Sequence, residues 1–399
     1  MTPRPLAVVA GTLTNACGAG WDAVRATLRA GRSALRPFDL EWAPPLATYI
    51  GRVTGLESVR LPATLTDLDS RNNRLAHVCL EQDEFRTAVA AAAARHGRDR
   101  IGVFVGTTTS GILSTELSFR AWQAWEEEAG QRPPLRLDRA VHNMHATTMF
   151  VRRTLGLAGP AQTISTACSS SAKVFAAAKR FIAAGHCDAA VVGGVDSLAL
   201  STLFGFRSLD LVSRGPCRPF AADRDGISIG EGAGFALLEP EGDGAVHLLG
   251  CGESSDAWHM SSPHPEGAGT AVAMRAALAA AAVPPEAIDY VNLHGTASRA
   301  NDAAEDRAVM SVFGGGTPAS STKGCTGHTL GAAGITEALI TIMALTDQWI
   351  PGTANCDVVD PSIGTAIVRE SRVQPLAAAM TNSFGFGGSN CSLVFGVAR

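Results

Sequence analysis

The stretch at residues 163–178, TISTACSSSAKVFAAA, constrains the fold of this chain more than any other. It begins with β-branched residues typical of a strand, turns at 167–170, and continues into an alanine-rich segment typical of a helix. A strand that passes directly into a helix indicates a βα architecture. It also places Cys168 at a helix N-terminus, where unpaired N–H groups favour negative charge. We therefore expect a lowered thiol pKa and a nucleophilic Cys168, although a buried structural cysteine is the commoner case.

The rest of the chain repeats this alternation of apolar strand-like and helix-like segments. Strands are predicted at 6–10 (ended by Gly11), 100–105, 188–194, 234–238, 245–249, 290–293, 377–381 and 391–395. Helices are predicted at 21–30, 75–96 (one or two), 113–128, 269–282, 303–313 and 334–345, with a break at 132–134 and a helix carrying His142 and His145. Such alternation implies a mostly parallel sheet covered by helices on both faces. No low-complexity linker interrupts the chain, so we expect one compact unit whose two halves meet near 240–244.

Composition excludes several classes of function. A formal net charge of −4 without a basic run argues against a nucleic-acid partner. The nine cysteines are scattered without a C-x-x-C pair, which argues for a reducing compartment and against disulfides or structural zinc. No signal peptide and no uninterrupted apolar run of membrane-spanning length is found. We therefore expect a soluble, cytoplasmic protein without a membrane span.

Three further stretches carry residues suited to chemistry. The first places His294 and Gly295 at the end of a predicted strand, where ligands collect in open α/β sheets, although a structural histidine fits equally well. The second, 323–334, has His328 among glycines, and Lys323 there has Glu337 as its available buried partner. The third, 382–390 (NSFGFGGSN), is either a flexible lid or a source of N–H donors for an oxyanion. Phosphate binding by this loop is the competing idea, but no Lys-Ser/Thr pair follows it.

Taken together, these blocks resemble the elongating β-ketoacyl-acyl-carrier-protein synthases of the thiolase superfamily over nearly the whole chain. The matching segments are 165–169, 193–194, 216–220, 224–226, 230–234, 294–296, 323–334 and 382–390. The resemblance implies an α/β thiolase fold of two similar βα halves that form a five-layered α-β-α-β-α core. Residues 1–242 would form the half with the nucleophile, and residues 243–399 the half with both catalytic histidines.

The residue types select the elongating branch of this superfamily. Initiating synthases use Cys, His and Asn, and thiolases use two cysteines and a histidine. Here the second helper is His328 in a Gly-His-x-x-Gly-Ala-Ala-Gly setting, which is similar to the Cys-His-His pattern. The chain departs from common members at 107–110, where Thr-Thr-Thr-Ser replaces a more Gly-rich turn, and at 221–222, where Ala-Ala precedes Asp223. The resemblance therefore does not define the shape of the substrate pocket.

The resemblance also implies a mechanism. Cys168 would take an acyl chain from a carrier-protein thioester, and malonyl-carrier protein would then lose CO₂ and attack the acyl-cysteine. His294 and His328 would donate Nε2–H to the enolate, and the backbone N–H groups of Cys168 and Phe386 would hold the oxyanion. Lys323 and its partner Glu337 would set the electrostatics around the second histidine.

The remaining site assignments concern the pocket. Phe386 is similar to the family's gating aromatic, Phe206 would form a pocket wall, and Thr296 and Ser298 would contact the phosphopantetheine arm. The resemblance implies no metal and no bound cofactor, because the acyl carrier protein supplies the phosphopantetheine.

Partners and pathway leave alternatives open. The expected partners are an acyl carrier protein and a second subunit, in a homodimer or in a heterodimer with a related synthase or chain-length-factor subunit. A non-catalytic partner subunit is the rival function, but such subunits lack the cysteine that this chain keeps at 168. Thiolytic cleavage would need a second catalytic cysteine near 385–387.

The acyl substrate is the least defined part of this interpretation. Segments 203–209 and 225–230 resemble synthases of bacterial aryl polyene-type pathways, whereas ordinary fatty-acid elongation is the alternative. His142, His145 and the turn at 107–110 would give a less apolar pocket if they line it. Otherwise they bond to backbone or lie on a subunit surface.

Overall fold

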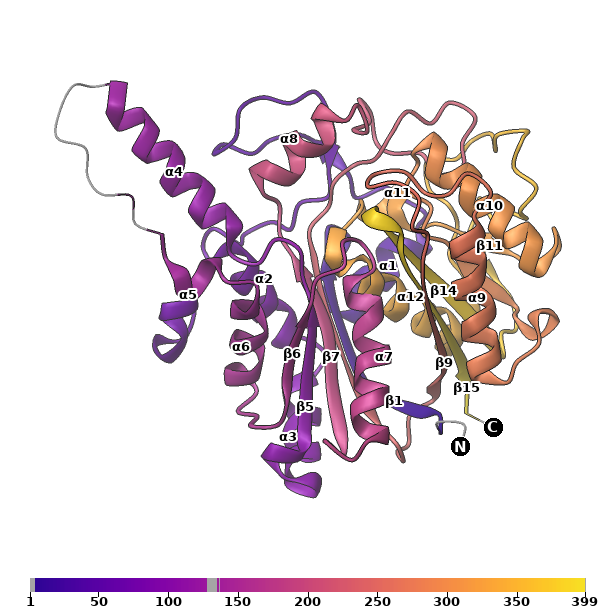
Figure 1. Cartoon of the computed structure of the whole chain (residues 1–399), viewed down its shortest axis with the longest axis horizontal. Coiled ribbons are helices and arrows are strands. Elements are labelled where there is room, and N and C mark those ends of the chain that lie inside the picture. Colours follow the sequence, from indigo (N-terminus) through magenta and orange to yellow (C-terminus); the bar gives the residue numbers. More distant parts are fainter. Residues whose placement is uncertain (1–3, 128–134, 136, 399) are drawn as a thin grey trace.

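One path of hydrogen-bonded strands runs through the whole molecule (Figure 1). The computed structural model describes residues 4–127, 135 and 137–398, so the predicted break at 132–134 lies outside the described residues. Among the described residues the central sheet has eleven strands, including the short β2 (Gly18–Ala19) that pairs with β1.

The first half of this sheet contains five strands in the order β6, β5, β7, β8 and β1. Their bounds are Ala161–Ile164, Ile101–Gly106, Ala189–Asp196, Gly232–Glu239 and Leu6–Asn15. The pairs β6–β5 and β5–β7 are parallel, whereas β7–β8 and β8–β1 are antiparallel.

The second half repeats this pattern with β11, β10, β14, β15 and β9. Their bounds are Ala319–Ser320, Tyr290–Asn292, Ala378–Gly385, Ser389–Val397 and Val246–Ser255. Two parallel pairs are again followed by two antiparallel pairs. The two halves are therefore similar, as expected, and an antiparallel pairing of β1 with β9 at 6–8 joins them.

The prediction of a mostly parallel sheet was wrong. Parallel pairing is confined to the outer strands of each half, and the six strands at the centre pair antiparallel. The predicted strand at 6–10 also runs on to Asn15, through Gly11. A Cβ at Gly11 would lie 2.9 Å from the side chain of Leu339, so glycine here lets a helix approach the strand and does not end it.

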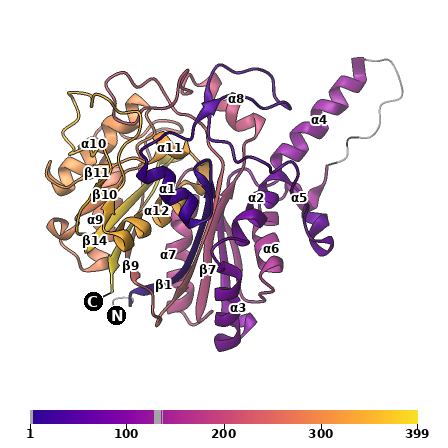
Figure 2. The ribbon, with the colours of Figure 1, turned by 180° about the vertical axis from the view of Figure 1, so that it is seen from behind.

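Two helices fill the space between the two halves of the sheet. They are α7 (Ser170–Ala183) and α12 (Ala333–Asp347), which pack on each other and share one apolar cluster with both halves. Strand β5 shows how alternation builds the layers, because Phe104 faces this inner cluster while Val103 and Val105 face an outer one. Figures 1 and 2 show helices on the outer face of each half as well.

The outer helices complete the five-layered arrangement. Those on the first half are α2 (Arg71–Leu80), α3 (Phe85–His96) and α6 (His145–Thr154), and those on the second are α9 (Ala268–Ala281) and α10 (Arg299–Phe313). The remaining helices are α1 (Trp21–Arg29), α4 (Ile112–Glu127), α5 (Arg139–His142), α8 (Leu200–Ser208) and α11 (Lys323–Thr326). Short two-residue strands are β3 (Arg36–Pro37), β4 (Tyr49–Ile50), β12 (Trp349–Ile350) and β13 (Arg372–Val373).

One helical stretch, Leu330–Asp347, is long and apolar enough to cross a membrane by composition. Within the folded chain 89% of that window is buried, because α12 lies between the two halves of the sheet. Its apolar composition therefore reflects its place in the core.

Candidate active site

The loop between β6 and α7 forms the sharp turn predicted around Cys168. Ala167 has a φ of 52°, in the left-handed region that costs a non-glycine residue about 1 kcal/mol. Ser170 holds the turn closed, since its hydroxyl donates to the Ala167 carbonyl at 2.5 Å and accepts from the Thr166 N–H at 2.9 Å. The end of β14 packs directly on this turn, because a Cβ at Gly385 would lie 2.7 Å from the Thr166 carbonyl.

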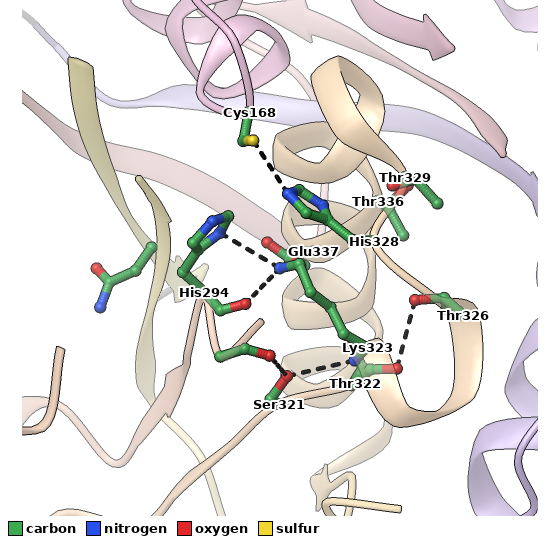
Figure 3. A network of polar contacts seen from close by, with 12 residues as sticks. Cys168, His294, Ser321, Thr322, Lys323, Thr326, His328, Thr329, Thr336 and Glu337 are labelled. Carbon is green, nitrogen blue, oxygen red and sulfur yellow. Dashed lines mark hydrogen bonds and ion pairs between the residues drawn. The ribbon is translucent and has the colours of Figure 1, made fainter. Parts of the chain in front are cut away.

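The structure brings the three predicted reactive side chains together (Figure 3). The sulfur of Cys168 and one nitrogen from each of His294 and His328 lie within 4.8 Å of one another. The Nε2 of His328 is 3.0 Å from the Cys168 sulfur, and the two imidazole rings meet edge to face with centroids 5.3 Å apart. His294 follows β10, and His328 follows α11, so one half of the fold contributes the thiol and the other contributes both imidazoles.

Behind the imidazoles lies the predicted buried ion pair of Lys323 and Glu337, whose side chains are in direct hydrogen-bond contact. The Lys323 ammonium also donates to the His294 carbonyl at 2.5 Å and to the His294 Nδ1 at 3.3 Å. Because Nδ1 accepts this bond, the proton of neutral His294 belongs on Nε2, which faces the site. Burial raises the pKa of Glu337 to about 7, and Lys323 opposes that shift.

The expected lowering of the Cys168 pKa was wrong. Burial raises the pKa of this thiol to about 12, and the charge of Lys323 and the N–H of Phe386 oppose the shift only in part. Burial, and then the charge of Lys323, hold the pKa of both imidazoles well below their usual range. The resting site is therefore a protonated thiol beside two neutral imidazoles, each with one N–H to donate.

A cavity of about 80 Å³ is lined by Cys168 and by both histidines. All four predicted pocket residues, Phe206, Thr296, Ser298 and Phe386, line it. Phe206, from α8, packs against Phe386 with ring centroids 5.3 Å apart, so the two aromatics form one wall.

The two hydroxyls in this cavity also shape the turn after His294. The Thr296 and Ser298 hydroxyls are 3.1 Å apart, and Ser298 caps α10 by accepting from the Asn301 N–H at 3.4 Å. Both remain at the cavity wall, where an incoming polar chain could contact them.

Two buried carboxylates that hold the site in place were missed from the sequence. Glu305 of α10 accepts from the N–H groups of His294 and Gly295 at 2.8 and 2.7 Å. Asp196, at the end of β7, accepts from the backbone and hydroxyls of the turn at 107–109 and from the Gly331 N–H at 2.6 Å. The run of three threonines was the available signal, since such hydroxyls suit a buried anion.

We expected His142, His145 and the turn at 107–110 to make the pocket less apolar if they line it, and their contacts show that they bond elsewhere. The turn at 107–109 binds Asp196, His142 contacts the Thr115 hydroxyl at 2.9 Å, and His145 contacts the Thr163 hydroxyl at 2.8 Å. None of them is among the residues that line the cavity. Its wall combines apolar residues such as Leu211, Ile227 and Phe384 with other polar ones, among them Asp256, Ser261, Ser262, Asn301 and Asn390.

Comparison with known proteins identifies this arrangement. Residues 4–243 match the model of the N-terminal domain of β-ketoacyl synthases, and residues 246–357 match that of the C-terminal domain. The chain is 40% identical over 317 residues to 3-oxoacyl-[acyl-carrier-protein] synthase 2 of Vibrio cholerae, covering 74% of this chain and 75% of that protein. It is 31% identical over 422 residues to the chloroplastic synthase I of Hordeum vulgare, covering 98% and 89%.

Solved structures agree with these sequence matches. A chain from the complex of the ketosynthase ApeO with its chain length factor ApeC, from Xenorhabdus doucetiae, superposes with a TM-score of 0.90 at 38% identity over 99% of this chain and 98% of that one. The ishigamide ketosynthase/chain length factor gives a TM-score of 0.87 at 25% identity over the full length of both chains.

Proposed function

Since the chain belongs to the β-ketoacyl synthase family, we propose that Cys168 carries an acyl chain, which the enzyme extends by decarboxylative condensation with malonyl-carrier protein. The observation that carries this proposal is the meeting of Cys168, His294 and His328 at one cavity, with the His328 Nε2 3.0 Å from the sulfur. A thiol next to a neutral imidazole can lose its proton as it attacks, so no preformed thiolate is required.

The first half-reaction is acyl transfer. The Cys168 sulfur attacks the thioester carbonyl of the acyl-carrier protein and gives up its proton to the departing phosphopantetheine thiolate, while the His328 Nε2–H donates to the sulfur as negative charge develops on it. The tetrahedral oxyanion would accept from the backbone N–H groups of Cys168 and Phe386, a proposal supported by the close packing of Gly385 on Thr166 and Cys168. The products are acyl-Cys168 and a free carrier-protein thiol.

The second half-reaction is condensation. The malonyl group loses CO₂, and the negative charge that develops on its thioester oxygen is stabilised by the Nε2–H donors of His294 and His328. The new carbon–carbon bond forms as the acyl–sulfur bond breaks, and the Cys168 thiolate then takes up one proton from solvent. Lys323 keeps the His294 proton on Nε2, and Glu337 partners the buried ammonium.

We propose that the substrates arrive on a carrier protein. Thr296 and Ser298 would contact the phosphopantetheine arm, which the acyl carrier protein supplies, so the enzyme itself would bind no cofactor. Phe386 would gate the acyl chain against the Phe206 wall. We place the enzyme in the cytoplasm, where its nine free cysteines would stay reduced.

The assembly and the pathway follow from the relatives. ApeO was solved with a chain length factor, and we propose a comparable heterodimer or a homodimer for this chain. Within each chain, residues 1–242 and residues 243–399 would form the two similar halves of the fold. We propose an aryl polyene-type chain over a saturated one, as the resemblance of 203–209 and 225–230 implied.

The test supplies purified protein with malonyl-carrier protein and a mixture of cinnamoyl-type and octanoyl-carrier proteins, and follows the products by intact mass. We expect β-ketoacyl-carrier protein with the wild-type enzyme, formed faster from the conjugated primer, and none with Cys168→Ala. No condensation product from either primer would overturn the proposed reaction. Preference for octanoyl would overturn only the assignment of substrate.

A further inference from the structure

Helix α8 carries the pocket wall, yet its own N-terminus lacks a local cap. Its N-cap residue is Ala199, whose side chain has no hydrogen-bond acceptor. The first N–H groups of a helix have no partner within the helix. Glu116, from α4, fills this role, because its two carboxylate oxygens accept from the N–H groups of Leu200 and Ser201 at 2.7 and 2.8 Å.

A second contact ties α4 to the same wall. The Arg120 guanidinium, one turn further along α4, donates to the Trp42 carbonyl at 2.7 Å. Trp42 packs in the apolar cluster that also contains Leu203 and Phe206 of α8. Glu116 therefore joins α4 to the start of α8, and Arg120 joins α4 to the Trp42 segment that packs with α8. The rest of α4 projects from the body of the molecule (Figures 1 and 2).

Helix α8 connects Glu116 to the pocket, because its first residues bind Glu116 and its later residue Phe206 lines the cavity. Phe206 lies six residues after Leu200, so about 9 Å of helix separates the capped end from the ring at the wall. Because a helix is nearly rigid over such a distance, a shift of the first turn of α8 would be transmitted to Phe206, whose ring packs on that of Phe386. The carboxylate also interacts favourably with the helix dipole.

We propose that Glu116 is a positioning residue for the acyl pocket. By binding the first N–H groups of α8, it fixes the position of that helix and so keeps the Phe206 ring packed on the Phe386 ring. This inference rests on the proposed function, in which that pocket receives the acyl chain. On this proposal a long acyl chain would pack along the Phe206 wall, whereas a two-carbon chain on Cys168 would make little contact with it. Loss of Glu116 therefore affects long primers selectively.

The experiment compares Glu116→Ala and Glu116→Gln with the wild-type enzyme, using acetyl- and octanoyl-carrier proteins and measuring kcat/KM for acylation of Cys168. We expect Glu116→Ala to lower the octanoyl value about tenfold, the scale of one lost charge-assisted hydrogen bond, with the acetyl value changed less than about twofold. Glu116→Gln should recover part of the loss, because the amide oxygen still accepts one N–H. The exposed Gln123 of α4 provides the control, since Gln123→Ala should match the wild type with both primers.

Equal losses with both primers, or a lowered melting temperature with unchanged kinetics, would show a purely structural role and overturn the inference. If Glu116→Ala does not fold, Glu116→Gln carries the same comparison. Wild-type protein that acylates Cys168 with neither primer would overturn the proposed function, and the inference with it.

Discussion

Cys168 and His328 together set the chemistry at the scale of single residues. The thiol is 5% exposed, and its pKa of about 12 means that burial dominates over the favourable charge of Lys323. The sequence correctly indicated which cysteine lies at the strand-to-helix turn beside the two histidines, because that turn is a local pattern. It could not indicate the direction of the pKa shift, because desolvation depends on the loops of both halves that close over the sulfur.

The raised thiol pKa predicts a steep pH dependence of alkylation. Only the thiolate reacts, so the rate of Cys168 labelling by iodoacetamide should rise about tenfold per pH unit between pH 6 and 9. Quenched samples analysed by peptide mapping give this rate for Cys168 separately from the other cysteines. A rate that is flat over this range would indicate a preformed thiolate–imidazolium pair and contradict the protonated resting state.

The two histidines should differ when each is replaced by alanine. His294 does not share the 3.0 Å contact that His328 makes with the sulfur, so His294→Ala should leave acylation of Cys168 within a few-fold of wild type. Condensation should fall about 10²–10³-fold, the effect of losing one oxyanion donor. His328→Ala should slow both steps. Equal loss of acylation in the two variants would show that these roles are wrongly divided.

Turns between elements place every reactive group. A non-glycine residue with positive φ stands near each one: Ala167 beside Cys168, Ala297 after His294 and Leu330 after His328. Such strained positions persist only where surrounding contacts hold them. Asp196 supplies such contacts for two turns at once, since it binds residues 107–109 and the Gly331 N–H, three residues after His328.

We predict that Asp196→Ala lowers the free energy of unfolding by about 3–5 kcal/mol, because it leaves several buried donors without an acceptor. Condensation should weaken further, since the His328 turn loses its anchor. Asp223→Ala is the matched control, because that carboxylate is 69% exposed in its pair with Arg218 and should change stability by less than about 0.5 kcal/mol. Urea unfolding measures both values, and similar effects of the two changes would contradict the anchoring role.

At the level of elements, the sequence predicted most helices and strands but not how the strands pair. Periodicity located β7, α9, α10 and α12 to within a few residues. Strand direction is not encoded in local periodicity, so the antiparallel centre of the sheet was missed. Asp196 and Glu305 were missed because their partners lie on other elements, and a single acidic residue gives no local signal of such a role.

The whole molecule is built so that neither half forms the site alone. The first half supplies Cys168, the second supplies His294 and His328, and β1 pairs with both β8 and β9. Helices α7 and α12 lie between the halves, and their buried side chains form one apolar core with strands of both halves.

This shared core predicts that the two halves unfold together. Urea transitions followed by tryptophan fluorescence and by far-UV circular dichroism should coincide, as in a cooperative two-state process. Separate transitions for the two signals would indicate halves that fold independently, and would contradict the proposal that they form one unit.

The most direct test of the account is the mass of the enzyme itself after incubation with octanoyl-carrier protein alone. The account predicts one added acyl group per chain, mapped by peptide analysis to Cys168 and removed when malonyl-carrier protein is added. Cys168→Ala should gain no mass. An unmodified wild-type chain, or an acyl group mapped to another residue, would contradict the central claim.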